Sequence, residues 1–274
     1  MSESNPYEAP AAELKEAAEG PQGRYHLAES PRANSIGAGG DWLGEGFHSF
    51  KRNWAAWIGA MLVGMVIMIV VSMIPVVNIL FDVFTYFIWV AGIAIGCRAQ
   101  SEGSSFTVGH LFAGFKRRPI PLMLLSITFY AAMIVAVFAT VGLVYPDIIT
   151  DETPTTLPDD PRLWFAMGIA FLLLTMIGMA TVFAPHLIVF HEATMFDAIR
   201  LSFSGCLKNI LPLLLWTLIM IVIFAVFIAF LVFALGSFFM WAIPPTILFF
   251  LVIVPVSFAS LYAAYEDIFL YRQH

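Results

Sequence analysis

Long apolar blocks separated by short polar stretches form the main pattern of the chain. Four blocks carry almost no charge, at about 54–97, 119–145, 163–190 and 210–265. A transmembrane helix needs about 20 predominantly apolar residues. The first and last blocks are long enough for two crossings each, with breaks at about 75–78 and near 236–245, and each middle block fits one. We therefore expect six transmembrane helices, at about 54–74, 79–97, 121–144, 163–186, 211–233 and 246–265.

A transmembrane β-barrel is the alternative that this pattern disfavours. Barrel strands have about ten residues that alternate between apolar and polar, whereas these blocks are apolar on every side. Composition agrees with a membrane protein, because the 274-residue chain is 60% apolar and only 12% charged, against about 25% charged in a soluble domain. The predicted fold class is therefore all-α integral membrane.

A short phrase recurs three times, and each copy leads into an apolar run. The copies are Phe-His-Ser-Phe at 47–50, Phe-Ala-Gly-Phe at 112–115 and Phe-Ser-Gly-Cys at 203–206. In the second and third copies a proline, Pro121 or Pro212, follows six residues later. Such recurrence predicts three repeats, each an interfacial amphipathic helix followed by a helical hairpin. The predicted units cover about 41–97, 107–190 and 194–271.

Polar residues that can cap a helix precede each amphipathic segment. Asp41 is the expected N-cap of the first segment and Thr107 that of the second. Thr194, with Asp197 three residues later, forms a variant capping box for the third. Apolar side chains then recur at helical spacing. These stripes are Leu43, Phe47, Phe50 and Trp54, then Val108, Leu111, Phe112 and Phe115, and finally Phe196, Ile199, Phe203 and Cys206.

Basic residues gather beside these segments and indicate an orientation. Lys and Arg are enriched on the cytoplasmic side of membrane helices. If both termini are cytoplasmic, only Arg162 lies outside, after an acidic loop that starts at Pro146. Cationic interfacial helices either anchor the fold or recognise anionic lipid or a partner protein. The candidate lipid-headgroup contacts are Lys51, Arg52, Lys116, Arg117, Arg118, Arg200 and Lys208.

Two other features concern the chain outside the span interiors. Residues 1–40 are rich in Pro, Gly, Ala, Ser and Glu, so we expect a disordered cytoplasmic tail that serves as a tether or carries a docking peptide at 5–10. Trp54, Trp57 and Trp164 lie near predicted helix ends, where we expect interfacial anchors.

Ionisable residues inside a membrane span are costly and are often functional. The two candidates are Asp82, near the outer end of the second span, and His186, which follows Pro185 near the inner end of the fourth. The alternatives are a hydrated Asp82 and a hydrogen-bonded imidazole at a local kink. No Lys, Arg or Glu lies inside a predicted span, which disfavours an ion-coupled carrier.

Reactive-site motifs are missing from the sequence. His48, His110 and His191 are expected near one face, but their spacing matches no metal-ligand motif. The chain has no Walker loop, nucleophile elbow or nucleotide fingerprint. We therefore expect no catalytic residue, no metal and no cofactor.

Pairs of small residues lie on two of the predicted spans. Gly92 and Gly96 form a G-x-x-x-G on the second span, and Ala259 and Ala263 have the same spacing on the sixth. Such pairs allow close helix packing. Packing within the fold and homodimerisation both remain open.

Several segments carry a family resemblance. Residues 42–52, 96–99, 109–115 and 260–269 resemble a group of uncharacterised bacterial inner-membrane proteins. Residues 192–209 are more distantly similar to the membrane domain that is sometimes fused to glycerophosphodiester phosphodiesterases. The resemblance implies a six-helix protein of the bacterial inner membrane. It carries over no activity, since the phosphodiesterase catalytic domain is absent from this sequence.

These observations favour a non-enzymatic scaffold or accessory subunit. Its expected partners are membrane lipids, including anionic ones, and a protein partner or a second copy, but no nucleic acid. A transporter or lipid-handling protein is the alternative, because related units can surround an apolar cavity. A lateral opening between the spans favours this alternative, and a solidly packed bundle excludes it.

Overall fold

The computed structural model describes residues 25–144, 162–237 and 239–272. Six helical segments in this part of the chain are long and apolar enough to cross a membrane, which confirms the predicted all-α membrane fold. They are α3 (Trp54–Ser72), α4 (Val77–Ser101), α6 (Pro119–Val144), α8 (Arg162–Thr181) with α9 (Ala184–His191), α11 (Ile210–Ser237) and α12 (Phe239–Phe269). The predicted acidic outer loop lies almost wholly at 145–161, outside the described residues.

Two predicted boundaries differ from the observed ones at prolines. The break expected near 236–245 is shorter, because α12 begins at Phe239 and includes Pro244 and Pro245. The fourth span is interrupted instead. Helix α8 ends at Thr181 and α9 restarts at Ala184, with Pro185 in its first turn, where a missing N–H costs least.

Short helices join the spans at one end of the molecule. They are α2 (Ala38–Arg52), the 3₁₀ helix η2 (Val108–Phe112), α5 (Ala113–Lys116) and α10 (Met195–Lys208). Thr107 and Thr194 are the N-caps, as predicted. Asp41 is not, since α2 begins three residues earlier and leaves Asp41 in its first turn. The second amphipathic segment is a 3₁₀ turn followed by one α-helical turn, and not a single helix.

The segment before α2 packs on the end of the chain. Strand β1 (Tyr25–Leu27) pairs antiparallel with β2 (Leu270–Arg272), so both described ends lie on the same side. The Arg32 side chain donates to the Asp267 carbonyl oxygen at 3.0 Å, and buried Asn209 donates to the Arg32 carbonyl oxygen at 2.7 Å. The expected disorder is therefore wrong for residues 25–40, because backbone pairing and buried polar contacts hold them. Residues 1–24 lie outside the described part.

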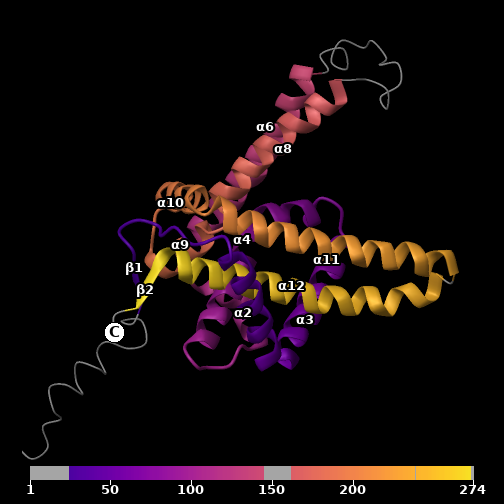
Figure 1. The fold of residues 1–274 in the computed structure, drawn as a ribbon, viewed down its shortest axis with the longest axis horizontal. Helices are drawn as coiled ribbons and strands as arrows, with labels where there is room; N and C mark the ends of the chain where they lie inside the picture. The colour runs from indigo at the N-terminus through magenta and orange to yellow at the C-terminus, as the bar shows by residue number, and fades with distance from the viewer. Residues whose placement is uncertain (1–24, 145–161, 238, 273–274) are drawn as a thin grey trace, which may run out of the picture.

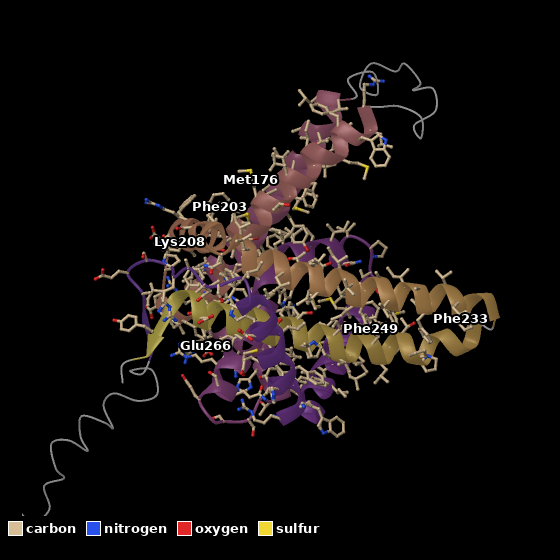
Figure 2. The ribbon with its side chains drawn as sticks, in the orientation of Figure 1. Met176, Phe203, Lys208, Phe233, Phe249 and Glu266 are labelled. Atoms are coloured by element: carbon tan, nitrogen blue, oxygen red, sulfur yellow. The ribbon has the colours of Figure 1, made fainter. Side chains whose placement is uncertain are left out.

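The hairpins diverge from a shared base (Figure 1). At the base, α9, α10, the last turns of α12 and the strand pair lie together, whereas α6–α8 and α11–α12 project in different directions. Figure 2 shows Phe233 and Phe249 far along hairpin α11–α12, and Glu266 at the base. In the spans formed by α3, by α8 with α9 and by α11, only 11% of the residues in the apolar 18-residue stretch are buried. The far parts of the spans therefore present apolar side chains outward, where lipid or another apolar surface covers them.

Small residues allow the short helices to pack closely on the spans. Helix α2 lies against α12 and α11, η2 and α5 lie against α4, and α10 lies against α8 and α9. A Cβ at Gly46 would lie 2.6 Å from the Val256 carbonyl oxygen, and one at Gly92 would lie 2.7 Å from that of His110. One at Gly96 would overlap the Phe106 ring. The G-x-x-x-G pair on α4 is therefore used for packing inside the fold.

The buried faces of α2 and α10 are offset from their bulky apolar stripes. Phe47 and Trp54 are exposed, whereas the α2 face on α12 contains Trp42 and Gly46. In α10, Phe196 is 76% exposed, and Ala198, Ser202, Gly205 and Cys206 are buried. Small side chains let backbones approach, so these contacts use them together with Trp42 and Phe50, and part of each bulky stripe stays exposed. Three-unit organisation stays a prediction.

Candidate functional site

The two ionisable residues predicted inside spans lie apart and form no common site. Asp82 is partly buried near the start of α4, at the opposite end from the base. His186 is 4% exposed in α9 and stacks on Tyr265, with ring centroids 5.0 Å apart. Within the described part of the chain, no hydrogen-bond partner reaches its buried Nδ1. The imidazole is therefore packed among aromatic rings, and the expected hydrogen bond is absent at Nδ1.

A polar cavity of about 690 Å³ lies at the base, between α2, α4 and α12. Basic side chains of His48, Lys51 and Arg52 line it from α2. Glu45 and Glu266 supply acidic groups, and Ser101 and Tyr262 supply hydroxyls. Its volume is in the range of small-molecule sites. This combination of both charges with hydroxyl groups makes the cavity the best candidate for a functional site.

The basic wall of the cavity is the last turn of α2. Arg52 donates through Nη2 to the Gln100 carbonyl oxygen at 2.6 Å, which fixes the end of α2 to the end of α4. Lys51 Nζ lies 4.9 Å from the centre of the Phe47 ring. Cations at a helix C-terminus also interact favourably with the partial negative charge of its unpaired carbonyls. The local sequence thus places two cations at one side of the cavity.

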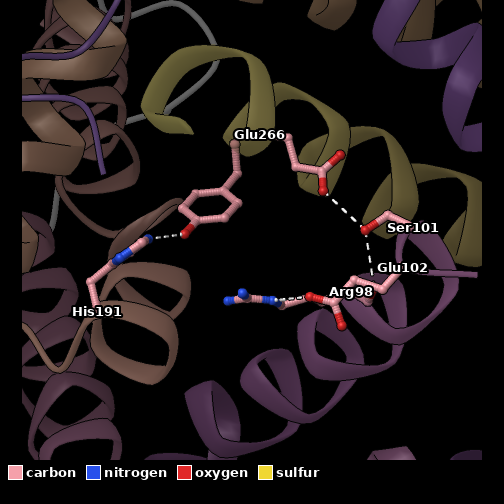
Figure 3. A network of polar contacts seen from close by, with 6 residues as sticks. Arg98, Ser101, Glu102, His191 and Glu266 are labelled. Atoms are coloured by element: carbon pink, nitrogen blue, oxygen red, sulfur yellow. Dashed lines mark hydrogen bonds and ion pairs between the residues drawn. The ribbon is translucent and has the colours of Figure 1, made fainter. Parts of the chain in front are cut away.

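The acidic wall is built from α4 and α12 (Figure 3). The Ser101 hydroxyl oxygen lies 3.0 Å from both Glu266 Oε1 and the Arg98 carbonyl oxygen, so its single proton is shared between these two acceptors. Arg98 pairs with Glu102 at 2.9 Å. The Glu266 carboxylate is therefore held in place by a hydroxyl on the neighbouring helix.

A second polar contact joins α12 to α9 near the acidic wall (Figure 3). His191 Nε2 lies 2.6 Å from the Tyr265 hydroxyl, which links α9 to α12 one residue before Glu266. The Arg98 guanidinium lies 4.8 Å from the centre of the Phe190 ring. These contacts fix the relative positions of α4, α9 and α12.

Gln100 joins three helices beside the cavity. Its amide is buried, and Nε2 donates to the Ser49 carbonyl oxygen at 2.6 Å. Its Oε1 accepts from the Ser49 hydroxyl at 3.0 Å and from Trp57 Nε1 at 3.3 Å. Trp57 is fully buried and stacks on Phe106 with centroids 3.8 Å apart. The prediction of Trp57 as an interfacial anchor is therefore wrong, whereas Trp54 and Trp164 are exposed near helix ends.

The remaining lipid-contact candidates lie outside the cavity. Lys116, Arg117 and Arg200 are exposed. Lys208 donates to the Pro31 carbonyl oxygen at 3.0 Å, so part of its donor capacity goes to the N-terminal segment. Arg118 has a positive φ of 51°, and its buried Nη1 has no hydrogen-bond partner among the residues that the structure describes. Of the seven predicted contacts, Lys51 and Arg52 are the ones that line the cavity.

The three histidines weighed as metal ligands occupy different environments. His48 lines the cavity, and His191 bonds to Tyr265. His110 Nδ1 accepts the Thr107 N–H at 3.0 Å, and burial lowers the pKa of this imidazole. Within the described ranges, no three His, Cys, Asp or Glu side chains gather as a metal site would require.

Sequence reasoning missed Gln100, Ser101 and Glu266 as members of one site. A local signal was present, because Arg98, Ser101 and Glu102 share one helical face, as do Tyr262 and Glu266. That signal predicts polar faces at the ends of two spans. It does not show that the two faces meet.

Comparisons of the chain with protein-family models, with curated proteins and with solved structures find no match.

Proposed function

We propose that the protein is a multi-pass protein of the bacterial inner membrane with both termini in the cytoplasm. The basic residues on α2, α5 and α10 support this orientation, since such residues are enriched on the cytoplasmic side. The resemblance to bacterial inner-membrane proteins supports the location. A reporter fused after His274 is expected to read out as cytoplasmic, and an extracytoplasmic signal would contradict the proposal.

Within that membrane, the protein acts as a non-enzymatic scaffold or accessory subunit. The divergence of hairpins α6–α8 and α11–α12 from the base is the observation that supports this role (Figure 1). Apolar helices gain little from packing against each other in lipid, so association depends on close contacts. Phe138 on α6 and Phe171 on α8 are more than 70% exposed. The spans of a partner protein would cover such faces.

Photocrosslinking in intact membranes tests this role. A photoreactive residue in place of Phe171 is expected to give one dominant protein adduct, and mild-detergent purification should recover the same partner in fixed ratio. The matched control replaces Phe196, which is equally exposed but lies on α10 at the base. Adducts with lipid alone at Phe171, together with recovery of the lone protein, would contradict a scaffold role.

A lipid-handling protein is the second candidate. The polar cavity between α2, α4 and α12 favours it, because that cavity is large enough for a lipid headgroup. The test measures the amount of lipid that stays bound after extensive washing in detergent, which removes the annular lipid. If no lipid is retained, this candidate function is excluded.

A further inference from the structure

The base cavity has two cations at the last turn of α2 and a carboxylate on α12, and Glu45 lies on a preceding turn of α2. Lys51 and Arg52 project from the last turn of α2, whereas Glu266 comes from α12. Ser101 and Tyr262 place hydroxyl groups on the acidic side. A ligand with one negative and one positive group satisfies both walls, whereas a simple anion would also face Glu45 and Glu266.

We propose that this cavity binds a phosphoethanolamine group, as found in an aminophospholipid headgroup or a water-soluble ester of the same kind. Arg52 and Lys51 provide charged donors for the phosphate. The primary ammonium has three N–H donors, which match the Glu266 carboxylate and the neighbouring hydroxyls. The proposal goes beyond a scaffold role and does not depend on it.

The geometry disfavours a choline group at the same place. A quaternary ammonium has no N–H donor, and proteins usually recognise it with several aromatic faces. Tyr262 is the one aromatic side chain among the residues found to line this cavity. Discrimination between primary and quaternary ammonium is therefore the most specific consequence of the proposal.

Both walls are held in position before a ligand arrives. Gln100 bonds the backbone and side chain of Ser49 on α2, and Ser101 holds Glu266. Positioning the binding groups in advance lowers the entropy lost on binding. The cavity adjoins Ala259 and Ala263, so its wall on α12 is lined by small side chains with room for a ligand.

The test uses the full-length protein in nanodiscs that contain equal amounts of dioleoyl phosphatidylethanolamine, phosphatidylglycerol and phosphatidylcholine. After controlled delipidation, native mass spectrometry counts the retained lipids. We expect phosphatidylethanolamine to be retained about tenfold over the other two, the effect of one charge-assisted contact. Equal retention of all three lipids by the wild-type protein would overturn the proposal.

Variants separate the two walls. Glu266→Gln keeps an acceptor for Ser101 but removes the charge, and it should abolish the preference over phosphatidylcholine. Lys51→Gln combined with Arg52→Gln should weaken retention of all three lipids. The matched control for Glu266→Gln is Glu192→Gln, which removes the same charge from an exposed residue outside the cavity. An unchanged preference in Glu266→Gln would overturn the proposal.

A blocking variant and a soluble competitor complete the test. Ala263→Leu should narrow the cavity one helical turn from Glu266 and weaken retention of the lipid, and unchanged retention in folded, monodisperse protein would count against the site. Millimolar glycerophosphoethanolamine is added in parallel. Displacement of the lipid would identify the soluble ester as a ligand, whereas retention would assign the site to the membrane lipid; both results support the shared chemistry.

Discussion

Single polar residues at the base connect helices that are distant in sequence. Gln100 of α4 bonds Ser49 of α2 and Trp57 of α3, and Ser101 bonds Glu266 of α12. A buried polar group without its partner costs about 1–3 kcal/mol. Such residues therefore stabilise the fold in two ways. They pack against neighbouring helices, and they supply hydrogen-bond partners to polar groups that are buried on those helices.

Replacing Gln100 by Leu should destabilise the protein by about 2 kcal/mol or more, because buried Trp57 Nε1 and the partly buried Ser49 carbonyl oxygen lose their partner. The measurement is the midpoint of thermal unfolding in mild detergent. Ser104→Ala, an exposed change near the same helix end, is the control and should leave the midpoint unchanged. Equal midpoints for both variants would contradict the assigned role of Gln100.

Cys206 should react very slowly with maleimides. The residue is 1% exposed, and burial raises its pKa to about 12, whereas an ordinary thiol has a pKa of about 8.5. In a Cys97→Ser variant at pH 8, native labelling should be slower than labelling in SDS by about a thousandfold. The labelling rate of the native protein should keep rising above pH 9, because the Cys206 thiol is still mostly protonated there. An ordinary thiol is largely ionised at that pH, so its labelling rate levels off. Comparable rates in the two conditions would show that Cys206 is accessible.

Residue roles that depend on local sequence were predictable, and those that depend on tertiary contacts were not. Thr107 and Thr194 cap helices through bonds to residues three positions away. Trp57 was misplaced because its burial comes from Phe106 and Gln100, which lie on other segments. Glu266 was missed for the same reason, since its contact with Ser101 spans 165 residues.

Among the elements, the short helices show how residue size decides packing. Their exposed faces carry bulky apolar side chains such as Phe47 and Phe196, and their protein contacts combine Gly, Ala and Ser with Trp42 and Phe50. Pattern analysis predicted that these segments exist and where two of them begin. That the bulky apolar side of these interfacial helices faces the membrane stays a prediction, and the exposure of Phe47 and Phe196 agrees with it.

A methyl group at Gly114 should disrupt the contact between α5 and α4. Its Cβ would overlap the Ile88 carbonyl oxygen and lie 3.1 Å from the Gly92 nitrogen. Gly114→Ala is expected to cost about 1–3 kcal/mol, measured by thermal unfolding in detergent. Gly109→Ala is the matched control, because its Cβ would have Thr107 Oγ1 at 3.7 Å as its nearest neighbour. Similar losses in the two variants would refute the close contact at Gly114.

For the whole molecule, apolar blocks and basic clusters were sufficient to predict six spans with the short helices at one end. They could not predict the divergence of the hairpins. Because the spans are apolar on every side, the sequence pattern does not indicate which faces pack together. The pairing of β1 with β2 was equally hidden, since it joins residues from the two ends of the chain.

The distance between the far ends of two hairpins tests the central claim most directly. Spin labels at Leu143 of α6 and Phe233 of α11, both at least 70% exposed, report this distance by pulsed electron resonance in nanodiscs. The control pair is Leu143 with Trp164 of α8, in the same hairpin. Diverging hairpins predict a long distance for the first pair and a short one for the control. Equally short distances, as for helices packed about 8–10 Å apart, would instead indicate a closed bundle and contradict the account.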